Sequence, residues 1–122
     1  MKPHILVVDD EAPIRELLCT YFQSRGYQVS SAATAYDAMI KAAETSLALI
    51  LLDLVLPDAD GLEVLGSLKK TLPDVPVIIM TGMGSDEALL KEAKDKGAAG
   101  YVSKTLPLDK LLAEVESSMG RH

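Results

Sequence analysis

The fold is decided by the stretch Leu49-Ile50-Leu51-Leu52-Asp53-Leu54-Val55-Leu56-Pro57-Asp58-Ala59-Asp60-Gly61, in which Asp53 interrupts a run of Leu, Ile and Val. The continuous apolar segment 47–52 predicts a strand that is covered on both faces, as in a parallel sheet. An isolated charge buried there would cost on the order of several kcal/mol. Asp53 is therefore expected where the strand reaches the rim of the core, and Pro57 and Gly61 are expected to shape the loop that follows.

Short apolar runs alternate with longer amphipathic stretches on both sides of this strand. The predicted strands are 5–8, 28–32, 47–52, 77–80 and 101–102, and the predicted helices are 14–25, 35–43, 61–71, 86–96 and a last one from 108. Five strand–helix pairs imply an α/β protein with a parallel sheet and helices on both faces. Right-handed crossovers favour a flavodoxin-like (βα)5 doubly wound sheet with five strands in the order 2-1-3-4-5.

Two of the predicted helices differ in the strength of their apolar face. Residues 61–71 place several leucines on one side, Leu62, Leu65, Leu68 and the following Leu72. Residues 86–96 offer a thinner face made of Ala88, Leu89 and Ala93. A weakly packed helix shifts at little cost, so this one is the expected mobile element.

The bulk composition limits the classes of function. The chain has 122 residues, 48% hydrophobic and 25% charged, which is typical of one soluble domain. Its net charge of −6 argues against nonspecific binding to nucleic acid or anionic membranes. No apolar run approaches the ~20 residues of a membrane span, and no signal peptide is recognisable. The single cysteine, Cys19, excludes an internal disulfide and fits the cytoplasm.

Chemically active side chains follow four of the five predicted strands. In open parallel sheets, sites form beyond the carboxyl ends of the strands. The residues found there are Asp9-Asp10-Glu11, Asp53, Thr81-Gly82 and Ser103-Lys104. Each could be ordinary surface chemistry alone, but together they place several carboxylates, a hydroxyl and an ammonium at one edge.

Clustered carboxylates need a cation. Two of them about 4–5 Å apart repel by roughly 3–4 kcal/mol at an effective dielectric near 20. Lys104 supplies one positive charge, and Mg²⁺ suits a site made of carboxylates, water and phosphate oxygens. A zinc site is excluded because His4 lies at the opposite end of its strand and no Cys or His cluster exists.

An Asp carboxylate in this setting is a candidate nucleophile toward phosphorus, giving an aspartyl phosphate. The metal and Lys104 would offset the charge of the phosphoryl group, and the Thr81 hydroxyl would hydrogen-bond one of its oxygens. Gly82 leaves room for the phosphoryl group to approach. The carboxylate that first looked out of place becomes a reactive group.

Together, these residues resemble the receiver domains of two-component response regulators. The resemblance covers essentially the whole chain, residues 1–122. It rests on the paired Asp9-Asp10, on Asp53 within L-L-D-L-V-L-P-D-A-D-G, and on Thr81-Gly82, Tyr101 and Lys104 in the family's order and spacing. The complete set is highly specific, although no single element is.

The resemblance implies a role for each matched residue. Asp53 is the phosphoacceptor. Asp10, Asp53 and the backbone carbonyl of Val55 bind Mg²⁺, with Asp9 acting through water. Thr81, Gly82 and Lys104 contact the phosphoryl group, and Thr81 with Tyr101 forms the switch pair.

One departure from the family pattern concerns the residue after Lys104. The family usually has proline there, preceded by a cis bond, whereas this chain has Thr105. A cis bond before a non-proline residue costs ~2.5–4 kcal/mol. The Lys104–Thr105 bond is therefore predicted to be trans, or cis only if its surroundings hold it.

The resemblance also implies partners. The phosphoryl donor is a histidine kinase or a histidine phosphotransfer protein, and the domain catalyses at most its own phosphorylation and dephosphorylation. The face formed by helix 86–96, the strand of Tyr101 and the helix from 108 is expected to reach an output domain or a downstream protein, or to form a homodimer. No output domain is expected within 1–122.

Three other interpretations remain. A haloacid dehalogenase-type phosphohydrolase needs a second Asp two residues after the nucleophile, where this chain has Val55. A flavodoxin-like FMN module needs a first loop that accepts phosphate, which Asp9-Asp10-Glu11 would repel. A degenerate receiver acting as a phosphorylation-independent interaction module keeps some support from the missing proline.

Overall fold

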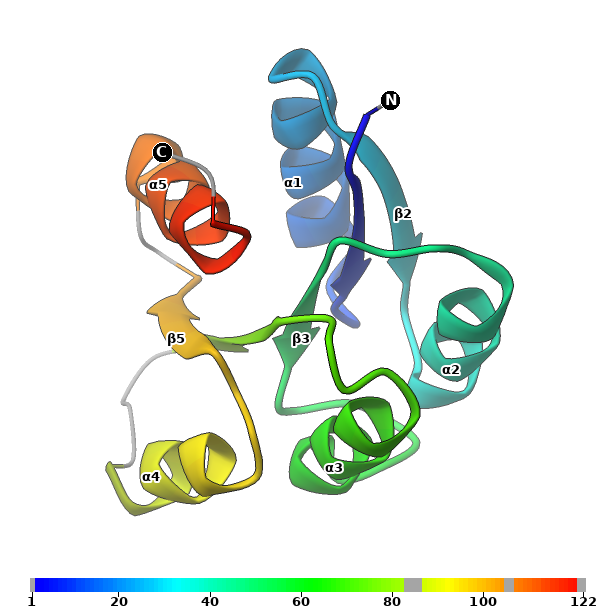
Figure 1. The fold of residues 1–122 in the computed structure, drawn as a ribbon, viewed down its shortest axis with the longest axis vertical. Coiled ribbons are helices and arrows are strands. Elements are labelled where there is room, and N and C mark those ends of the chain that lie inside the picture. Colours follow the sequence, from blue (N-terminus) through cyan, green and yellow to red (C-terminus); the bar gives the residue numbers. More distant parts are fainter. Residues whose placement is uncertain (1, 83–86, 105–106, 121–122) are drawn as a thin grey trace.

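A computed structural model describes residues 2–82, 87–104 and 107–120 of the chain. Strands and helices alternate along it (Figure 1). The strands are β1 (His4–Val8), β2 (Gln28–Ala32), β3 (Leu49–Asp53), β4 (Val77–Thr81) and β5 (Gly100–Ser103). The helices are α1 (Ala12–Ser24), α2 (Ala35–Glu44), α3 (Gly61–Thr71), α4 (Glu87–Asp95) and α5 (Leu108–Ser118).

The sheet confirms the predicted topology. All neighbouring strands are parallel, in the order β2-β1-β3-β4-β5. In the register of this sheet, Val8 lies beside Leu52, and Asp53 lies beside Met80. The carboxyl ends of β1, β3 and β4 therefore meet at one edge.

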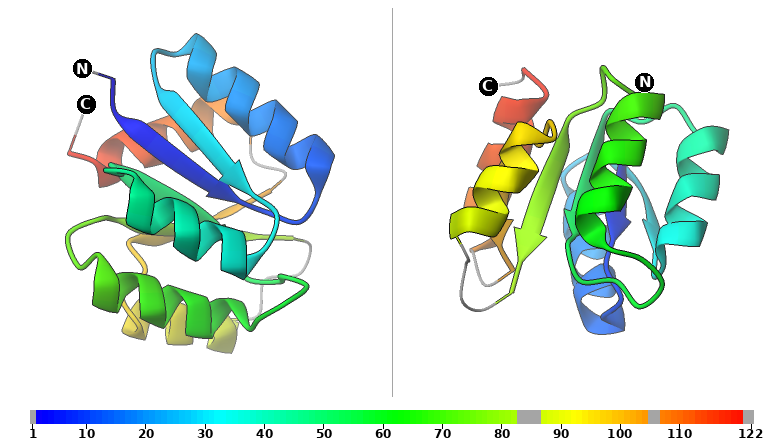
Figure 2. Two further views of the ribbon diagram at one scale, coloured as in Figure 1. Left: turned by 90° about the vertical axis from the view of Figure 1, so that its right-hand side faces the viewer. Right: turned by 90° about the horizontal axis from the view of Figure 1, so that it is seen from below.

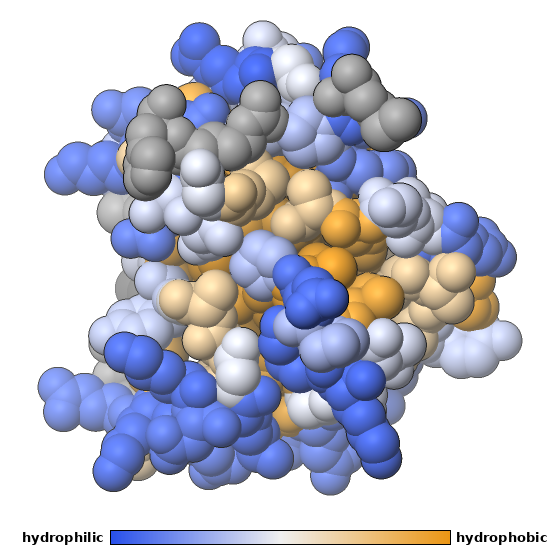
Figure 3. All heavy atoms as spheres, viewed as in Figure 1, coloured by the Kyte–Doolittle hydropathy of each residue, from blue (hydrophilic) through white to orange (hydrophobic). Residues whose placement is uncertain are grey.

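Helices cover both faces of the sheet, which explains why β3 is apolar from Leu49 to Leu52. Leu49 and Leu51 pack with α1 and α5, whereas Ile50 and Leu52 pack with α2, α3 and the Ala93 side of α4. The two helical layers lie on opposite sides of the strands in Figure 1, and α4, α3 and α2 run side by side in the right panel of Figure 2. On the face seen in Figure 3, apolar residues gather in the centre and hydrophilic residues surround them.

Glycines follow the last turns of α1 and α4. Gly26 has φ +93° and Gly97 has φ +107°, in the left-handed region where a side chain is strained. The Gly26 N–H donates to the Gln23 carbonyl, and the Gly97 N–H donates to the Lys94 carbonyl. These are the helix ends that the sequence predicts.

Most predicted elements differ from the structure by one or two residues at an end, and two differences bear on the site and on α4. β3 begins at Leu49 and includes Asp53, whereas we predicted 47–52. In α4, Leu90 and Ala93 are buried and Ala88 and Leu89 are exposed, so the predicted face was wrong except at Ala93. A face with so few apolar residues does not fix the rotation of a helix by pattern alone. The predicted first residue of this helix, Asp86, lies outside the described residues.

The helices were also compared with the requirements of a bilayer. Within the described part of the chain, no helix is both long and apolar enough to cross a membrane.

Candidate phosphoacceptor site

Two buried carboxylates lie at the carboxyl edge of the sheet. Asp53 is the last residue of β3 and is 3% exposed, and Asp9 directly follows β1 and is 0% exposed. They are the only buried polar or charged residues in the described part of the chain. Because β1 and β3 are paired, the fold brings these two predicted residues together.

Both oxygens of Asp53 are hydrogen-bonded. Its Oδ2 accepts from Lys104 Nζ at 2.8 Å, and its Oδ1 accepts from the backbone N–H of Val55 at 3.0 Å. The second bond is local and turns the chain immediately after the strand. The first joins residues 51 positions apart, and it orients one carboxylate oxygen toward a cation.

Asp9 is less completely satisfied. Its Oδ1 accepts from the backbone N–H of Glu11 at 2.8 Å. Its buried Oδ2 lies 2.9 Å from Lys104 Nζ, but this ion pair lacks hydrogen-bond geometry, and Oδ2 has no hydrogen-bond partner among the described residues. Burial raises the pKa of Asp9, and the contacts with Lys104 and the Glu11 N–H reverse only part of that rise.

Lys104 joins three carboxylates. Its Nζ lies 2.8 Å from Asp53, 2.9 Å from Asp9 and 2.9 Å from Glu11. Burial by itself would lower the pKa of Lys104, but the contacts with Asp53, Asp9 and Glu11 outweigh burial and raise that pKa above the usual range for lysine. The ammonium therefore stays charged at neutral pH. Its backbone N–H donates to the Thr81 carbonyl at 2.8 Å, which fixes the end of β5 against β4.

Glu11 is a member of the cluster that the predicted site omitted. The sequence places it in the acidic run after β1, but its contact with Lys104 joins residues 93 positions apart. Nothing in the local pattern distinguishes it from a surface glutamate. The contact arises because Lys104, which directly follows β5, reaches across the carboxyl edge of the sheet to residues at the ends of β1 and β3.

The acidic residues fit a divalent metal. Asp9, Asp10, Glu11 and Asp53 each offer a carboxylate oxygen, and these four oxygens lie within 4.8 Å of one another. Oxygen donors are the ligands that Mg²⁺ prefers. The buried Asp9 Oδ2, which contacts Lys104 without a hydrogen bond, is the observation that most favours binding of a metal ion or a water here.

Val55 lies in the loop after β3. Residues Val55 and Asp60 face each other across an isolated antiparallel bridge, and the Gly61 N–H donates to the Leu54 carbonyl at 3.2 Å. The hydrogen bond of this bridge is therefore made by the neighbouring residues Leu54 and Gly61, and not by Val55 itself. The bridge leaves the Val55 carbonyl outside its hydrogen bonding.

The remaining predicted residues lie on β4 and β5. The Thr81 hydroxyl donates to the Val102 carbonyl at 3.3 Å. A Cβ on Gly82 would meet no atom of the described residues within 4 Å. Tyr101 is 53% exposed on β5. The predicted trans Lys104–Thr105 bond lies outside the described residues because Thr105 is among those not described.

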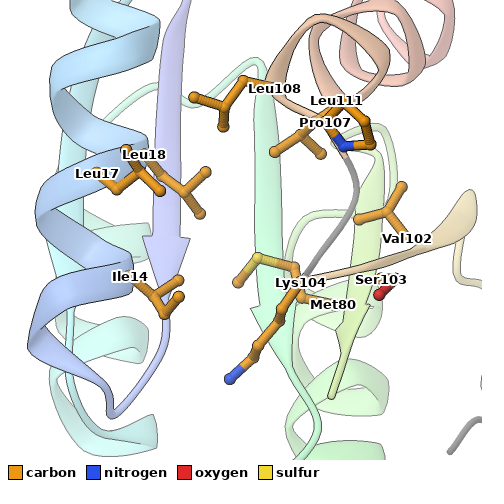
Figure 4. Close-up of a pocket in the computed structure, with 10 residues that line it drawn as sticks. All are labelled: Ile14, Leu17, Leu18, Met80, Val102, Ser103, Lys104, Pro107, Leu108 and Leu111. Atoms are coloured by element: carbon orange, nitrogen blue, oxygen red, sulfur yellow. The ribbon is translucent and has the colours of Figure 1, made fainter. Parts of the chain in front are cut away.

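An apolar pocket of about 260 Å³ adjoins Lys104 on the side away from the carboxylates. It is lined from α1 by Ile14, Leu17 and Leu18, and from the α5 side by Pro107, Leu108 and Leu111. Figure 4 shows the Lys104 ammonium pointing away from Pro107, Leu108 and Leu111. Apolar surroundings on one side of the ammonium strengthen its attraction to the carboxylates on the other.

The chain was compared with known proteins. Residues 5–116 match the family model of the response regulator receiver domain. The transcriptional regulatory protein KdpE of Mycobacterium tuberculosis is 38% identical over 118 residues, which are 97% of this chain and 51% of that protein. This chain therefore spans about half the length of that regulator.

Solved structures give the same result. A response regulator receiver domain protein from Methanospirillum hungatei superposes with a TM-score of 0.92 at 30% identity, covering 98% of this chain and 95% of that one. A BeF3-activated DrrB receiver domain superposes with a TM-score of 0.89 at 30% identity, covering 99% of this chain and all of the other.

Proposed function

This chain belongs to the family of response regulator receiver domains, and from that premise we propose that it is a phosphoacceptor in a two-component or phosphorelay system. Asp53 receives the phosphoryl group from a histidine kinase or a histidine phosphotransfer protein. The observation that carries the proposal is the buried Asp53 carboxylate, held at the site edge with Oδ2 facing the Lys104 ammonium.

The transfer is a displacement at phosphorus. A carboxylate oxygen of Asp53 forms the new O–P bond, the P–N bond of the donor phosphohistidine breaks, and its electron pair returns to the imidazole nitrogen. Lys104 then pairs with the phosphoryl oxygens, and the Thr81 hydroxyl hydrogen-bonds one of them beside Gly82, which has no side chain.

The proposed cofactor is Mg²⁺, held by Asp10, Asp53 and the Val55 carbonyl, with Asp9 acting through water. When bound, the metal offsets the negative charge that gathers on the transferred group. The four clustered carboxylates and the Asp9 Oδ2 that has no hydrogen bond among the described residues support this assignment. Lys104 alone neutralises only one of those charges.

The test is phosphorylation by a small acyl phosphate with Mg²⁺, followed by intact mass. Wild-type protein should gain one phosphoryl group, Asp53→Asn should gain none, and chelation of Mg²⁺ should prevent the gain. Asp95→Asn on α4 is the matched control, because it removes an exposed carboxylate that lies far from Asp53 in the sequence. A wild type that never gains the group would favour the phosphorylation-independent interaction module. An Asp53→Asn protein that gains it equally would show that another residue is the acceptor.

The signal follows from the added charge. Phosphorylation adds roughly −1.5 to −2 charge units and three acceptor oxygens at this edge. We propose that the Thr81 hydroxyl leaves the Val102 carbonyl for a phosphoryl oxygen and that the Tyr101 ring, now 53% exposed, moves inward. The surface of α4, β5 and α5 then binds the output domain, a downstream protein or a second copy.

Beryllofluoride, named in the activated DrrB neighbour, serves as the phosphoryl mimic in the test of this switch. Adding it with Mg²⁺ should shift the amide resonances of α4 and of the strand that carries Tyr101. Unchanged resonances there, with shifts at Asp53, would retain the phosphoacceptor and reject this output face.

We propose the domain organisation, location and mode of output by analogy with the family. Residues 1–122 act as one receiver domain, in the cytoplasm, and make their output through protein contacts. The net charge of −6 supports an output that does not contact nucleic acid directly. Catalysis is limited to gaining and losing the phosphoryl group.

A further inference from the structure

The loop between β3 and α3, residues 54–60, is closed at its base by backbone contacts. The Gly61 N–H bonds the Leu54 carbonyl, and a Cβ on Gly61 would lie 2.3 Å from that carbonyl oxygen. Only glycine permits this approach. Asp60 then caps α3 by accepting from the Leu62 N–H at 2.9 Å. These contacts fix where the loop ends but not its middle.

The middle of the loop carries Val55, whose side chain gives it little anchorage. Val55 is 75% exposed, so its side chain packs against little. Leu56 is buried in the core beside α2 and α3 and holds one side of the loop. The Val55 N–H is bonded to Asp53 Oδ1, and Asp58 adds a further attachment between Val55 and α3.

Asp58 bonds to the first turn of α2. Its Oδ1 accepts from the Ala35 N–H at 2.8 Å, and its Oδ2 accepts from the Tyr36 N–H at 3.0 Å. The third N–H of the turn, from Asp37, donates to Thr34 Oγ1 at 3.1 Å. Asp58 and Thr34 thus divide the donors that a helix start leaves unpaired.

The charge of Asp58 suits this position. A carboxylate at the N-terminus of a helix is stabilised by the helix dipole. The two N–H bonds lower the pKa of Asp58, so it stays ionised well below neutral pH. The attachment of the loop to α2 therefore persists under ordinary conditions.

We propose that Asp58 is a positioning residue for the metal site, tying the loop of Val55 to α2 and so holding the Val55 carbonyl in place. The proposal rests on the proposed function, in which that carbonyl binds Mg²⁺. Asp58 touches neither metal nor phosphoryl group; it acts through the loop. By reciprocity of linked equilibria, Mg²⁺ should in turn hold the start of α2 more firmly.

The test measures Mg²⁺ affinity by calorimetry in wild type and in Asp58→Ala. Loss of a group that orients a metal ligand typically weakens affinity 10–100-fold, and we expect a weakening of about tenfold here. Thr34→Ala is the matched control, because it removes the other cap of the same helix without touching the loop. Its Mg²⁺ affinity should stay at the wild-type value. Asp58→Asn keeps one acceptor oxygen, so its Mg²⁺ affinity should lie between those of wild type and Asp58→Ala.

Each outcome decides the proposal. Equal affinity in wild type and Asp58→Ala overturns it, and so does an equal loss in Asp58→Ala and Thr34→Ala, since helix stability would then explain both. A wild type that binds no Mg²⁺ overturns the proposed metal site and this inference with it.

A second measurement covers the case in which Asp58→Ala does not fold. In wild type, Mg²⁺ should slow hydrogen exchange at the Ala35 and Tyr36 amides, which bond to Asp58, more than at the Asp37 amide, which bonds to Thr34. Exchange that Mg²⁺ leaves unchanged at Ala35 and Tyr36 would overturn the proposal.

Discussion

The acidic edge and the α4–β5 face differ in how firmly their residues are held. All five residues of β3 are buried, and Asp53 at its end has both oxygens hydrogen-bonded. In α4, two side chains are buried, Leu90 and Ala93, and Tyr101 on β5 is more than half exposed. The acidic edge is held by a fully buried strand, whereas α4 is held by only two buried side chains.

That difference matches the two tasks that we propose for the domain. Accepting a phosphoryl group requires carboxylate, ammonium and hydroxyl groups in set positions, because misplacement of reacting groups slows transfer. Transmitting the event requires a segment that changes position at small cost in free energy, and weakly packed segments open most easily. The fold places the firm region at its centre and the weak one at the β5 side.

The largest expected effect compares core packing in the two regions. Leu51→Ala on β3 should lower the free energy of unfolding by about 2–5 kcal/mol, because Leu51 is fully buried and the change leaves a cavity. Leu89→Ala on α4, where the side chain is 36% exposed, should lower it by about 1 kcal/mol. Urea denaturation measures both. Equal losses would mean that α4 is packed as firmly as the centre of the sheet.

A smaller effect is expected from the two lysines. Lys104→Met should lower stability by about 2 kcal/mol in metal-free protein, because the buried Asp9 and Asp53 lose their charged partner. Lys94→Met, at an exposed position of α4, should change stability by less than about 0.5 kcal/mol. If the two variants unfold at the same urea concentration, the ion pairs of Lys104 contribute nothing to the firmness of the edge.

The smallest effect concerns Asp9. Its pKa is raised in the folded state by burial, so the folded protein binds this proton more tightly than the unfolded chain does. The stabilisation from protonation is complete below the ordinary value of 3.8 and is lost as the pH rises through the raised pKa. Asp9→Asn should therefore stabilise metal-free protein at neutral pH, by less than Lys104→Met destabilises it, since Lys104 already offsets part of the cost.

The pH dependence provides the control for this last prediction. The advantage of Asp9→Asn should shrink as the pH falls through the raised pKa, because the wild-type carboxyl becomes neutral there as well. Asp95→Asn, an exposed residue of α4, should show no such dependence. Thermal unfolding over a pH series measures it, and a constant difference between Asp9→Asn and wild type would contradict the assigned cause.

Several site residues could be predicted from their place at strand ends. Asp53 follows an apolar run, and Asp9, Thr81 and Lys104 follow three other strands, so the topology rule brings them together. The rotation of α4 could not be predicted, because two or three small apolar residues fit several orientations. Leu90 was missed for that reason.

By itself, the sequence determined the order of the elements, the parallel sheet and the position of Asp53, because these follow from periodicity, glycines and neighbours a few residues away. Only the tertiary structure decided that Lys104 reaches Glu11 and that Asp58 caps α2, contacts that span 93 and 23 residues. It also decided that one oxygen of Asp9 has no hydrogen bond among the described residues. Such contacts depend on how loops from separate parts of the chain meet once the sheet has formed. No local sequence pattern encodes which residues of these loops come within contact distance.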